Sequence, residues 1–370
     1  MTLFPDLAAL KALDTPALVI DADALERNIA RMAETARRRG IALRPHAKTH
    51  KSPDIARLQI GAGAAGICCA TLAEAEAMSA AGIDGLLVTA PTMGEARFER
   101  IAKLNRVRPL LIVVDHLVQV EGLTRILRSD DPVLGVLVDV DVGQMRTGVT
   151  AVADALAIGK AIASSPRLRF AGLQGYAGHV QHIPDATARK TAAETSSNIL
   201  GAYAQALTGA GLKPGMITGS GTGAHVFDLE SGPYTELQVG SYALMDADYA
   251  AVHDGAGKGP EFAPALFVMG TVVSVNRAGE VTVDAGTKAL ATNGPPPCHI
   301  LGAPAGSTYR FAGDEHGIIT VPAGRACPAL GTRILIGATH CDPTVNLHDR
   351  YHVVRDGSVT VWRIAGRYGA

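Results

Sequence analysis

A basic segment, Arg44 to Lys51 (RPHAKTHK), places amines and imidazoles close to the end of an apolar run. We expect a strand over residues 41–48, so that Lys48 falls at its carboxyl end. An amine that is partly desolvated and near other cations has a lowered pKa, and it then acts as a nucleophile that forms a Schiff base. A solvated loop lysine is the alternative interpretation.

Glycines cluster in a second segment, residues 219–223 (GSGTG), which follows an expected strand and precedes a short helical pattern. Glycine lets the backbone approach a ligand closely, and N–H groups at the start of a helix attract phosphate. Alone the pattern is a weak signal. After the seventh strand of a (β/α)8 barrel, however, it stands where phosphate sites recur.

A third segment, residues 340–349 (HCDPTVNLHD), closes an expected strand with a histidine and a carboxylate. His340 and Asp342 are two residues apart, so on a strand they face the same side. Together they can hold one divalent ion with open positions for water and substrate. Cys341 would then face the other way. A surface His/Asp pair without a metal is the alternative.

The elements that must position these residues alternate between apolar runs and Ala-rich helical patterns. We expect strands at residues 41–48, 66–71, 85–90, 109–115, 134–142, 170–178, 215–221 and 235–243. Apolar strands separated by crossover helices indicate a parallel sheet covered on both faces. Eight such units fit a closed (β/α)8 barrel, in which chemistry gathers at the carboxyl ends of the strands. A doubly wound open sheet is the rival fold, but it usually carries a Gly-rich turn after its first strand, and none is present there.

The sequence pattern changes after residue 260. Residues 265–286 indicate two strands around an Arg-Ala-Gly turn, and residues 331–342 and 350–364 indicate further strands, without helical periodicity. An early strand over residues 15–23 is expected to join this β region. We therefore predict an N-terminal segment (1–23), a barrel (24–248) and a smaller C-terminal all-β domain (249–370).

The composition is that of a globular enzyme with no electrostatic preference for polyanions. Among 370 residues, 47% are apolar and 19% charged, and the formal net charge is -1, which gives no reason to expect binding to nucleic acid or to an anionic membrane. The five cysteines show no paired spacing, which favours a reducing compartment. No signal peptide or membrane span is indicated, so we expect a cytoplasmic protein.

Two stretches at the start of the chain, TPALVIDADALERNIARM and LRPHAKTHKSPDIARLQ, resemble the D-threonine aldolase and D-serine dehydratase family. These are pyridoxal 5'-phosphate (PLP) enzymes with the alanine racemase-like fold, called fold type III: a PLP-binding (β/α)8 barrel followed by a β domain. The resemblance extends over almost the whole chain. It implies that Lys48, rather than Lys51, holds PLP as a Schiff base.

The resemblance also implies roles for residues at the barrel mouth. His182 would be the catalytic base, whereas a solvated loop histidine is the better interpretation of His179. The cofactor would be bound by Lys48, Arg146, Tyr176, Ser220, Gly221, Thr222, Gly223, Gln238, Gly240, Ser241 and Tyr242. Gln238 falls where alanine racemases place an arginine near the pyridine nitrogen. Asp139 and Asp141 share a strand face, and with Arg146 they either orient the cofactor or form an ion pair at the barrel end.

The metal site of the family is implied at His340 and Asp342. Dehydratases of this family carry a cysteine where Asp342 stands, and a thiolate suits zinc. The carboxylate suits Mn²⁺ or Mg²⁺ and indicates the aldolase branch. Arg350 stands where many aldolases carry an aromatic residue, and if it reaches the substrate it would favour a second carboxylate.

The leading hypothesis is a PLP- and divalent-metal-dependent lyase that splits D-threonine and related D-β-hydroxy amino acids into glycine and an aldehyde. A 3-hydroxy-D-aspartate aldolase or D-serine dehydratase activity at the same site is the first alternative. A non-catalytic PLP-binding homeostasis protein is the second. A homodimer is expected by analogy with racemase-fold enzymes.

Overall fold

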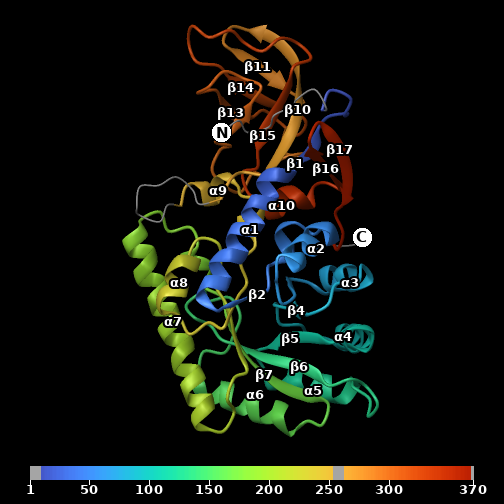
Figure 1. Ribbon diagram of the computed structural model, residues 1–370, viewed down its shortest axis with the longest axis vertical. Coiled ribbons are helices and arrows are strands. Elements are labelled where there is room, and N and C mark those ends of the chain that lie inside the picture. The colour runs from blue at the N-terminus through green and yellow to red at the C-terminus, as the bar shows by residue number, and fades with distance from the viewer. Residues whose placement is uncertain (1–9, 253–261, 368–370) are drawn as a thin grey trace. The chain divides into compact units, whose positions relative to one another are not determined.

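The computed structural model describes residues 10–252 and 262–367. Residues 1–9, on which the expectation about a signal peptide partly rests, lie outside this range, as do residues 253–261 and 368–370 of the predicted β domain. The described chain forms two compact units (Figure 1). The barrel unit contains residues 31–240, Val252 and 365–367, and the sheet unit contains residues 10–30, 241–251 and 262–364. Helix α1 (Ala22–Arg39) begins in the sheet unit and ends in the barrel unit.

The barrel unit is built on eight parallel strands. They are β2 (Ala42–Leu43), β3 (Ile67–Cys69), β4 (Leu86–Val88), β5 (Leu110–Val114), β6 (Leu134–Asp139), β7 (Leu168–Gly175), β8 (Met216–Gly219) and β9 (Glu236–Leu237). Their order is β2-β9-β8-β7-β6-β5-β4-β3, and a parallel bridge between His46 and Cys68 joins the two ends of this series. Seven of the eight predicted runs contain one of these strands, and the run at 170–178 overlaps β7, which begins earlier, at Leu168. The predicted (β/α)8 barrel is confirmed.

Helices follow the strands of the barrel and cover it. They are α2 (Pro53–Gly61), α3 (Leu72–Ala80), α4 (Glu95–Val107), α5 (Leu117–Ile126), α6 (Val152–Ser164), α7 (Ala186–Gly209) and α8 (His225–Ser231), with the 3-10 turns η1 (Ala47–Thr49) and η2 (Gly178–Val180). Several begin at side-chain caps: Ser52 accepts from the N–H of Ile55, and Asp185 accepts from that of Ala188. No helix in the described ranges is long and apolar enough to cross a membrane.

The sheet unit is built on a nine-stranded sheet that both ends of the chain share. Its strands are β1 (Ala17–Asp21), β10 (Leu266–Arg277), β11 (Glu280–Val283), β12 (Ile300–Leu301), β13 (Thr308–Phe311), β14 (Gly317–Thr320), β15 (Arg333–Gly337), β16 (Arg350–Arg355) and β17 (Ser358–Arg363). Strand β1 pairs antiparallel with β10 and parallel with β16, as expected for residues 15–23. Asp356 and Gly357 both have positive φ angles, which is the backbone of the tight hairpin between β16 and β17.

Short helical segments also occur in the sheet unit. They are α9 (Ala247–Ala250), η3 (Ser241–Ala243) and α10 (Cys341–Asn346). Helix α10 corrects the prediction that residues 340–342 close a strand, because strand β15 already ends at Gly337. The apolar residues of α10 that face inward are too few to give a readable helical period, which is why the sequence pattern missed it.

A buried ion pair lies inside the barrel, close to where the first and last strands meet. Arg44 and Glu236 are joined by two contacts of 2.9 Å, and both side chains are almost fully buried. Thr218 donates to the same carboxylate, and Arg44 also donates to the carbonyl of Gly85. Each charge is therefore compensated by a partner of opposite charge, which the low-dielectric interior requires.

We predict that Glu236→Gln lowers the free energy of unfolding by about 3 kcal/mol or more, because it leaves the Arg44 guanidinium buried without a counter-charge. Urea denaturation of the purified variant measures this loss. The matched control is Glu76→Gln, which breaks the exposed pair with Arg100. An exposed pair contributes at most about 1 kcal/mol. Equal losses in the two variants would contradict the prediction.

Candidate active site

Lys48 lies in η1, directly after the first barrel strand, and its side chain is half-buried. The nearby Lys51 is engaged elsewhere. Its ammonium group lies 2.8 Å from the buried carboxylate of Glu74 and donates to the carbonyl of Lys48 at 3.0 Å. The Lys51 amine is thus occupied by a carboxylate and a carbonyl inside the protein, so of the two lysines Lys48 is the better placed for covalent chemistry.

Hydrogen bonds around His46 fix both its tautomer and the backbone beside Lys48. The N–H of Lys48 donates to Nδ1 of His46 at 3.3 Å, so Nδ1 is an acceptor. In the neutral ring the proton is therefore on Nε2, which lies 3.0 Å from Oγ1 of Thr89. That hydroxyl in turn donates to the carbonyl of Cys69. The histidine of the basic segment thus supports the lysine-bearing turn.

Three buried polar side chains form a chain of hydrogen bonds across the carboxyl ends of the strands. Nε2 of Gln174 donates to Oδ1 of Asp139 at 2.8 Å and to the carbonyl of Thr89 at 2.9 Å. Nε2 of Gln238 donates to Oε1 of Gln174 at 3.1 Å. Thr147 donates to the other oxygen of Asp139. Burial raises the pKa of Asp139 to about 6, although these amide and hydroxyl donors oppose the shift.

The glycine segment after β8 is braced by Gln181. Oε1 of this side chain accepts from the N–H of Gly223 at 2.9 Å, and its Nε2 donates to the carbonyl of Ala177. A Cβ atom added at Gly221 would lie 2.5 Å from Oε1 of Gln181, and one at Gly223 would lie 2.0 Å from its carbonyl. Ser220 adopts a φ of 68°, in the left-handed region. Side chains larger than glycine are thus excluded at Gly221 and Gly223, whereas Ser220 and Thr222 of the same loop carry hydroxyls.

Of the two roles considered for Asp139 and Asp141 with Arg146, the ion pair at the barrel end does not form. The Arg146 guanidinium lies 5.7 Å from the centre of the Tyr176 ring, and in the described structure no salt bridge joins it to either aspartate. Asp141 instead accepts from the N–H groups of Gly143 and Met145, so it shapes the turn that presents Arg146. The two candidate cofactor residues, Arg146 and Tyr176, are therefore brought together by a cation–π contact.

His182 lies just after η2 and is exposed. His179 is also exposed, and its N–H donates to Gln144 at 2.6 Å.

His340 and Asp342 do approach each other, but through helix geometry rather than along a strand. His340 is the N-cap of α10, and Asp342 lies in its first turn. Nε2 of His340 is 3.6 Å from Oδ2 of Asp342, and both side chains are partly exposed. Nδ1 of the same histidine lies 3.0 Å from the amide nitrogen of Asn293. In the described ranges no group of three or more His, Cys, Asp or Glu residues could hold a metal, so the candidate metal donors here stay the two predicted ones.

Cys341, between these two residues, is fully buried. Its Sγ donates to the carbonyl of Met245, and its N–H donates to Asp246. Burial raises the pKa of the Cys341 thiol well above its usual value. A thiol that stays protonated is a poor metal ligand, which agrees with the expectation that Cys341 faces away from the pair.

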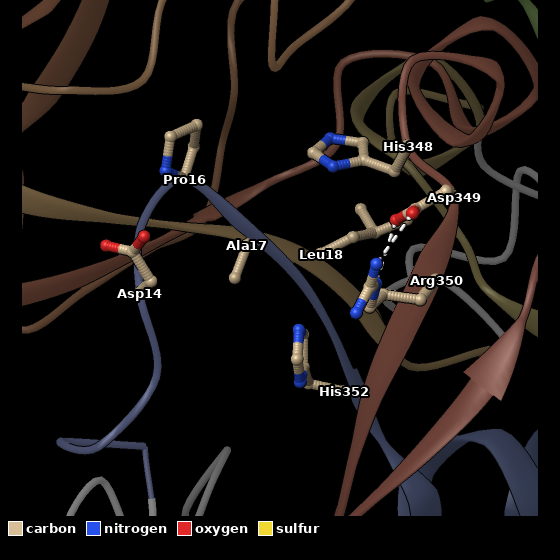
Figure 2. A pocket seen from close by; sticks show the side chains of 8 residues that line it. All are labelled: Asp14, Pro16, Ala17, Leu18, His348, Asp349, Arg350 and His352. Atoms are coloured by element: carbon tan, nitrogen blue, oxygen red, sulfur yellow. Dashed lines mark hydrogen bonds and ion pairs between the residues drawn. The ribbon is translucent and has the colours of Figure 1, made fainter.

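A pocket of about 270 Å³ lies in the sheet unit, and Arg350 is one of the residues that line it. The pocket is lined by Asp14, Pro16, Ala17, Leu18, His348, Asp349, Arg350 and His352. Figure 2 shows these side chains. The Arg350 guanidinium forms a bidentate pair with Asp349, with contacts of 2.9 and 2.8 Å. Neither His340 nor Asp342 lines the pocket. The charge of Arg350 is thus already compensated within its own unit.

Two residues essential to this arrangement were missed by sequence reasoning. Gln174 and Gln181 lie on either side of Tyr176, and each connects elements that are distant in sequence. The only sequence signal is their position near the end of an expected strand. Ser241 and Tyr242 are buried and belong to the sheet unit, so their predicted part in a phosphate site stays a prediction.

Comparison with known proteins assigns both regions of the chain. Residues 20–248 match the family model described as alanine racemase, N-terminal domain, and residues 265–354 match the putative serine dehydratase domain. A D-threonine aldolase from Arthrobacter sp is 41% identical over 97% of this chain and 94% of its own length. A 3-hydroxy-D-aspartate aldolase from Paracoccus denitrificans (strain Pd 1222) is 38% identical over 98% and 95%. The crystal structure of D-threonine aldolase from Filomicrobium marinum superimposes with a TM-score of 0.91, at 39% identity and 97% coverage of both chains.

A buried carboxylate behind the glycine segment makes stability depend on pH. Burial raises the pKa of Asp228 to about 6, from an ordinary value of 3.8, although the Ser220 and Ser197 hydroxyls oppose this shift. Between these two pH values the folded chain binds more protons at this site than the unfolded chain does. The contribution is therefore fully present below pH 4 and is lost as the pH rises through 6.

We predict that Asp228→Asn reduces the fall in the free energy of unfolding between pH 4 and pH 6.5 by up to about 3 kcal/mol. Urea denaturation of both proteins across this range measures the difference. Asp139 titrates in both proteins and so cancels in the comparison. Parallel pH profiles for wild type and variant would show that Asp228 does not carry the effect.

Proposed function

Because the chain belongs to the family of D-threonine aldolases and their alanine racemase-like relatives, we propose that it is a PLP- and divalent-metal-dependent D-threonine aldolase. It would cleave D-threonine, D-allo-threonine and other D-β-hydroxy-α-amino acids to glycine and an aldehyde. The observation that carries the proposal is the placement of Lys48. Its side chain follows the first barrel strand, while the competing Lys51 is held by Glu74.

The barrel residues fit PLP. The glycines of the loop at residues 220–223 lie against Gln181, and its other two residues, Ser220 and Thr222, carry hydroxyls. A tight glycine loop with hydroxyl donors is suited to bind a phosphate. We assign the phosphate group of PLP to this loop and to Gly240, Ser241 and Tyr242. We assign the pyridine ring of PLP to Arg146, Tyr176 and Gln238. Lys48 would bind the aldehyde carbon. PLP supplies an electron sink for the Cα–Cβ bond that breaks.

The substrate hydroxyl must lose a proton when this bond breaks. We assign His182 as the base that takes this proton, since an imidazole titrates near neutral pH and this one is exposed. His340 and Asp342 would hold a divalent ion, with Mn²⁺ preferred and Mg²⁺ an alternative, because imidazole and carboxylate donors suit these ions. Such an ion supplies Lewis acidity for the hydroxyl.

The alternatives differ in substrate. A 3-hydroxy-D-aspartate aldolase needs a cation for the second carboxylate. Arg350 could supply it only by exchanging its exposed partner Asp349 for the substrate. A D-serine dehydratase would need a different metal donor at Asp342. A non-catalytic PLP-binding protein would have no use for the His340 and Asp342 pair. We further propose a homodimer, by analogy with the fold. From the near-neutral charge and the unpaired spacing of the cysteines we propose a cytoplasmic location without a nucleic-acid or membrane partner.

We predict that the purified protein with PLP and Mn²⁺ releases glycine and acetaldehyde from D-threonine, and neither product from L-threonine. Lys48→Ala should lower the rate at least about 1,000-fold, because the amine that anchors the cofactor is lost. Lys103→Ala, on the exposed face of α4, is the control and should retain full activity. Coupled assays for the two products measure this. Pyruvate from D-serine without glycine would instead establish the dehydratase alternative.

The metal assignment predicts a change in ion preference. Asp342→Cys should raise the affinity for Zn²⁺ relative to Mn²⁺ by at least about 10-fold, because a thiolate replaces a carboxylate. His340→Ala should abolish tight binding of either ion. Asp349→Asn is the control, since its carboxylate pairs with Arg350. Titration calorimetry on all three variants measures the affinities. Unchanged Mn²⁺ binding in His340→Ala would remove this histidine from the site.

A further inference from the structure

The hydrogen bonds of the chain Asp139, Gln174 and Gln238 have a fixed direction. The amide group of Gln174 lies 2.9 Å from the carbonyl oxygen of Thr89, and a carbonyl oxygen can only accept. The NH2 group of Gln174 must therefore face Thr89 and Asp139, whatever the protonation state of that aspartate. Its carbonyl oxygen must then face Gln238.

The orientation of the Gln174 amide fixes the orientation of the Gln238 amide. Gln238 lies 3.1 Å from the carbonyl oxygen of Gln174, so its NH2 group is the donor there. The remaining atom of that amide is its carbonyl oxygen, Oε1. Within the described ranges Oε1 accepts no hydrogen bond, although the Gln238 side chain as a whole is buried. The site is thus left with a hydrogen-bond acceptor at this position rather than a donor.

We propose that Gln174, backed by Asp139 and Thr89, is a positioning residue that holds Gln238 with its carbonyl oxygen as the acceptor for the protonated ring nitrogen of PLP. The inference rests on the proposed function, since it assigns the ring to Gln238. The contacts of Gln174 with Thr89, Asp139 and Gln238 determine which end of the Gln238 amide is free.

The consequence is a ring nitrogen that keeps its proton. An arginine at this position can only donate, so it favours the unprotonated nitrogen. An amide oxygen can only accept, so it favours the protonated nitrogen, whose positive charge strengthens the electron sink. A neutral glutamine could present either of its two ends, and Gln174 decides which one.

The test is ¹⁵N NMR of the holoenzyme loaded with PLP labelled at the ring nitrogen, recorded as a function of pH. We expect a protonated nitrogen at neutral pH in the wild type. Gln238→Leu should lower the pKa of this nitrogen by about one to two units, which is a 10- to 100-fold loss of proton affinity. Gln174→Met should lower it as well, since the Gln238 amide is then free to turn over. Gln238→Glu keeps an acceptor and should restore protonation.

The control is Thr147→Val, which removes the other hydrogen bond to Asp139 and leaves Gln174 bound. It should leave the ring pKa unchanged. An unprotonated nitrogen in the wild type, or a pKa unaffected by Gln238→Leu, would overturn the inference. A pKa lowered in Gln238→Leu but not in Gln174→Met would remove Gln174 from it.

If Gln174→Met does not fold, the wild type and the two Gln238 variants still decide which end of the Gln238 amide faces the ring. Borohydride reduction followed by peptide mapping separates this inference from the proposed function. Cofactor trapped on Lys48 together with an unprotonated ring nitrogen overturns the inference alone. Failure to trap any cofactor on Lys48 overturns both.

Discussion

The backbone hydrogen bonds on both sides of Leu43 to His46 are the constraint on which the barrel unit depends. The N–H groups of Arg44 and His46 donate to Leu237 and Val239 on one side. On the other side, the carbonyls of Leu43 and Pro45 accept from Ala65 and Cys68. This alternation closes the barrel. It also delivers Lys48 to the carboxyl end of the strands, one turn after the last of these bonds.

Two buried ion pairs support the closed barrel, because the backbone that closes it also carries basic side chains into the interior. Arg44 points into the barrel because its backbone is fixed there, and it needs Glu236 from the last strand as its counter-charge. Lys51 lies on the other side of Lys48 and needs Glu74. Two of the basic residues in this segment are thus committed to structure. The segment looks uniformly reactive in sequence, but its parts have separate roles in the fold.

How much of the structure the sequence could predict depends on how far apart in the sequence the interacting residues lie. The eight barrel strands and β1 are local apolar runs, so their pattern is visible without any partner. The residues at the ends of these runs, such as Lys48 and Gly221, could also be placed from local pattern. The pairing of Arg146 with Tyr176, the brace from Gln181 and the role of Gln174 depend on contacts between different strands and loops, and no local pattern contains them. The prediction of a strand at residues 340–342 was wrong. A spacing of two residues brings side chains together on a strand, but an N-cap and the first turn of a helix bring them together as well.

The parallel pairing of β1 with β16 has a consequence for the order in which the chain is assembled on the ribosome. Val19 pairs with His352, so β1 is translated more than 300 residues before its partner β16. The barrel strands lie entirely between these two and need neither of them, so they can pair while translation continues. During that interval β1, whose five residues are all buried in the finished sheet, is an apolar edge without its partners. The apolar side chains of β1 must therefore be protected in another way until residues 350–355 have been made.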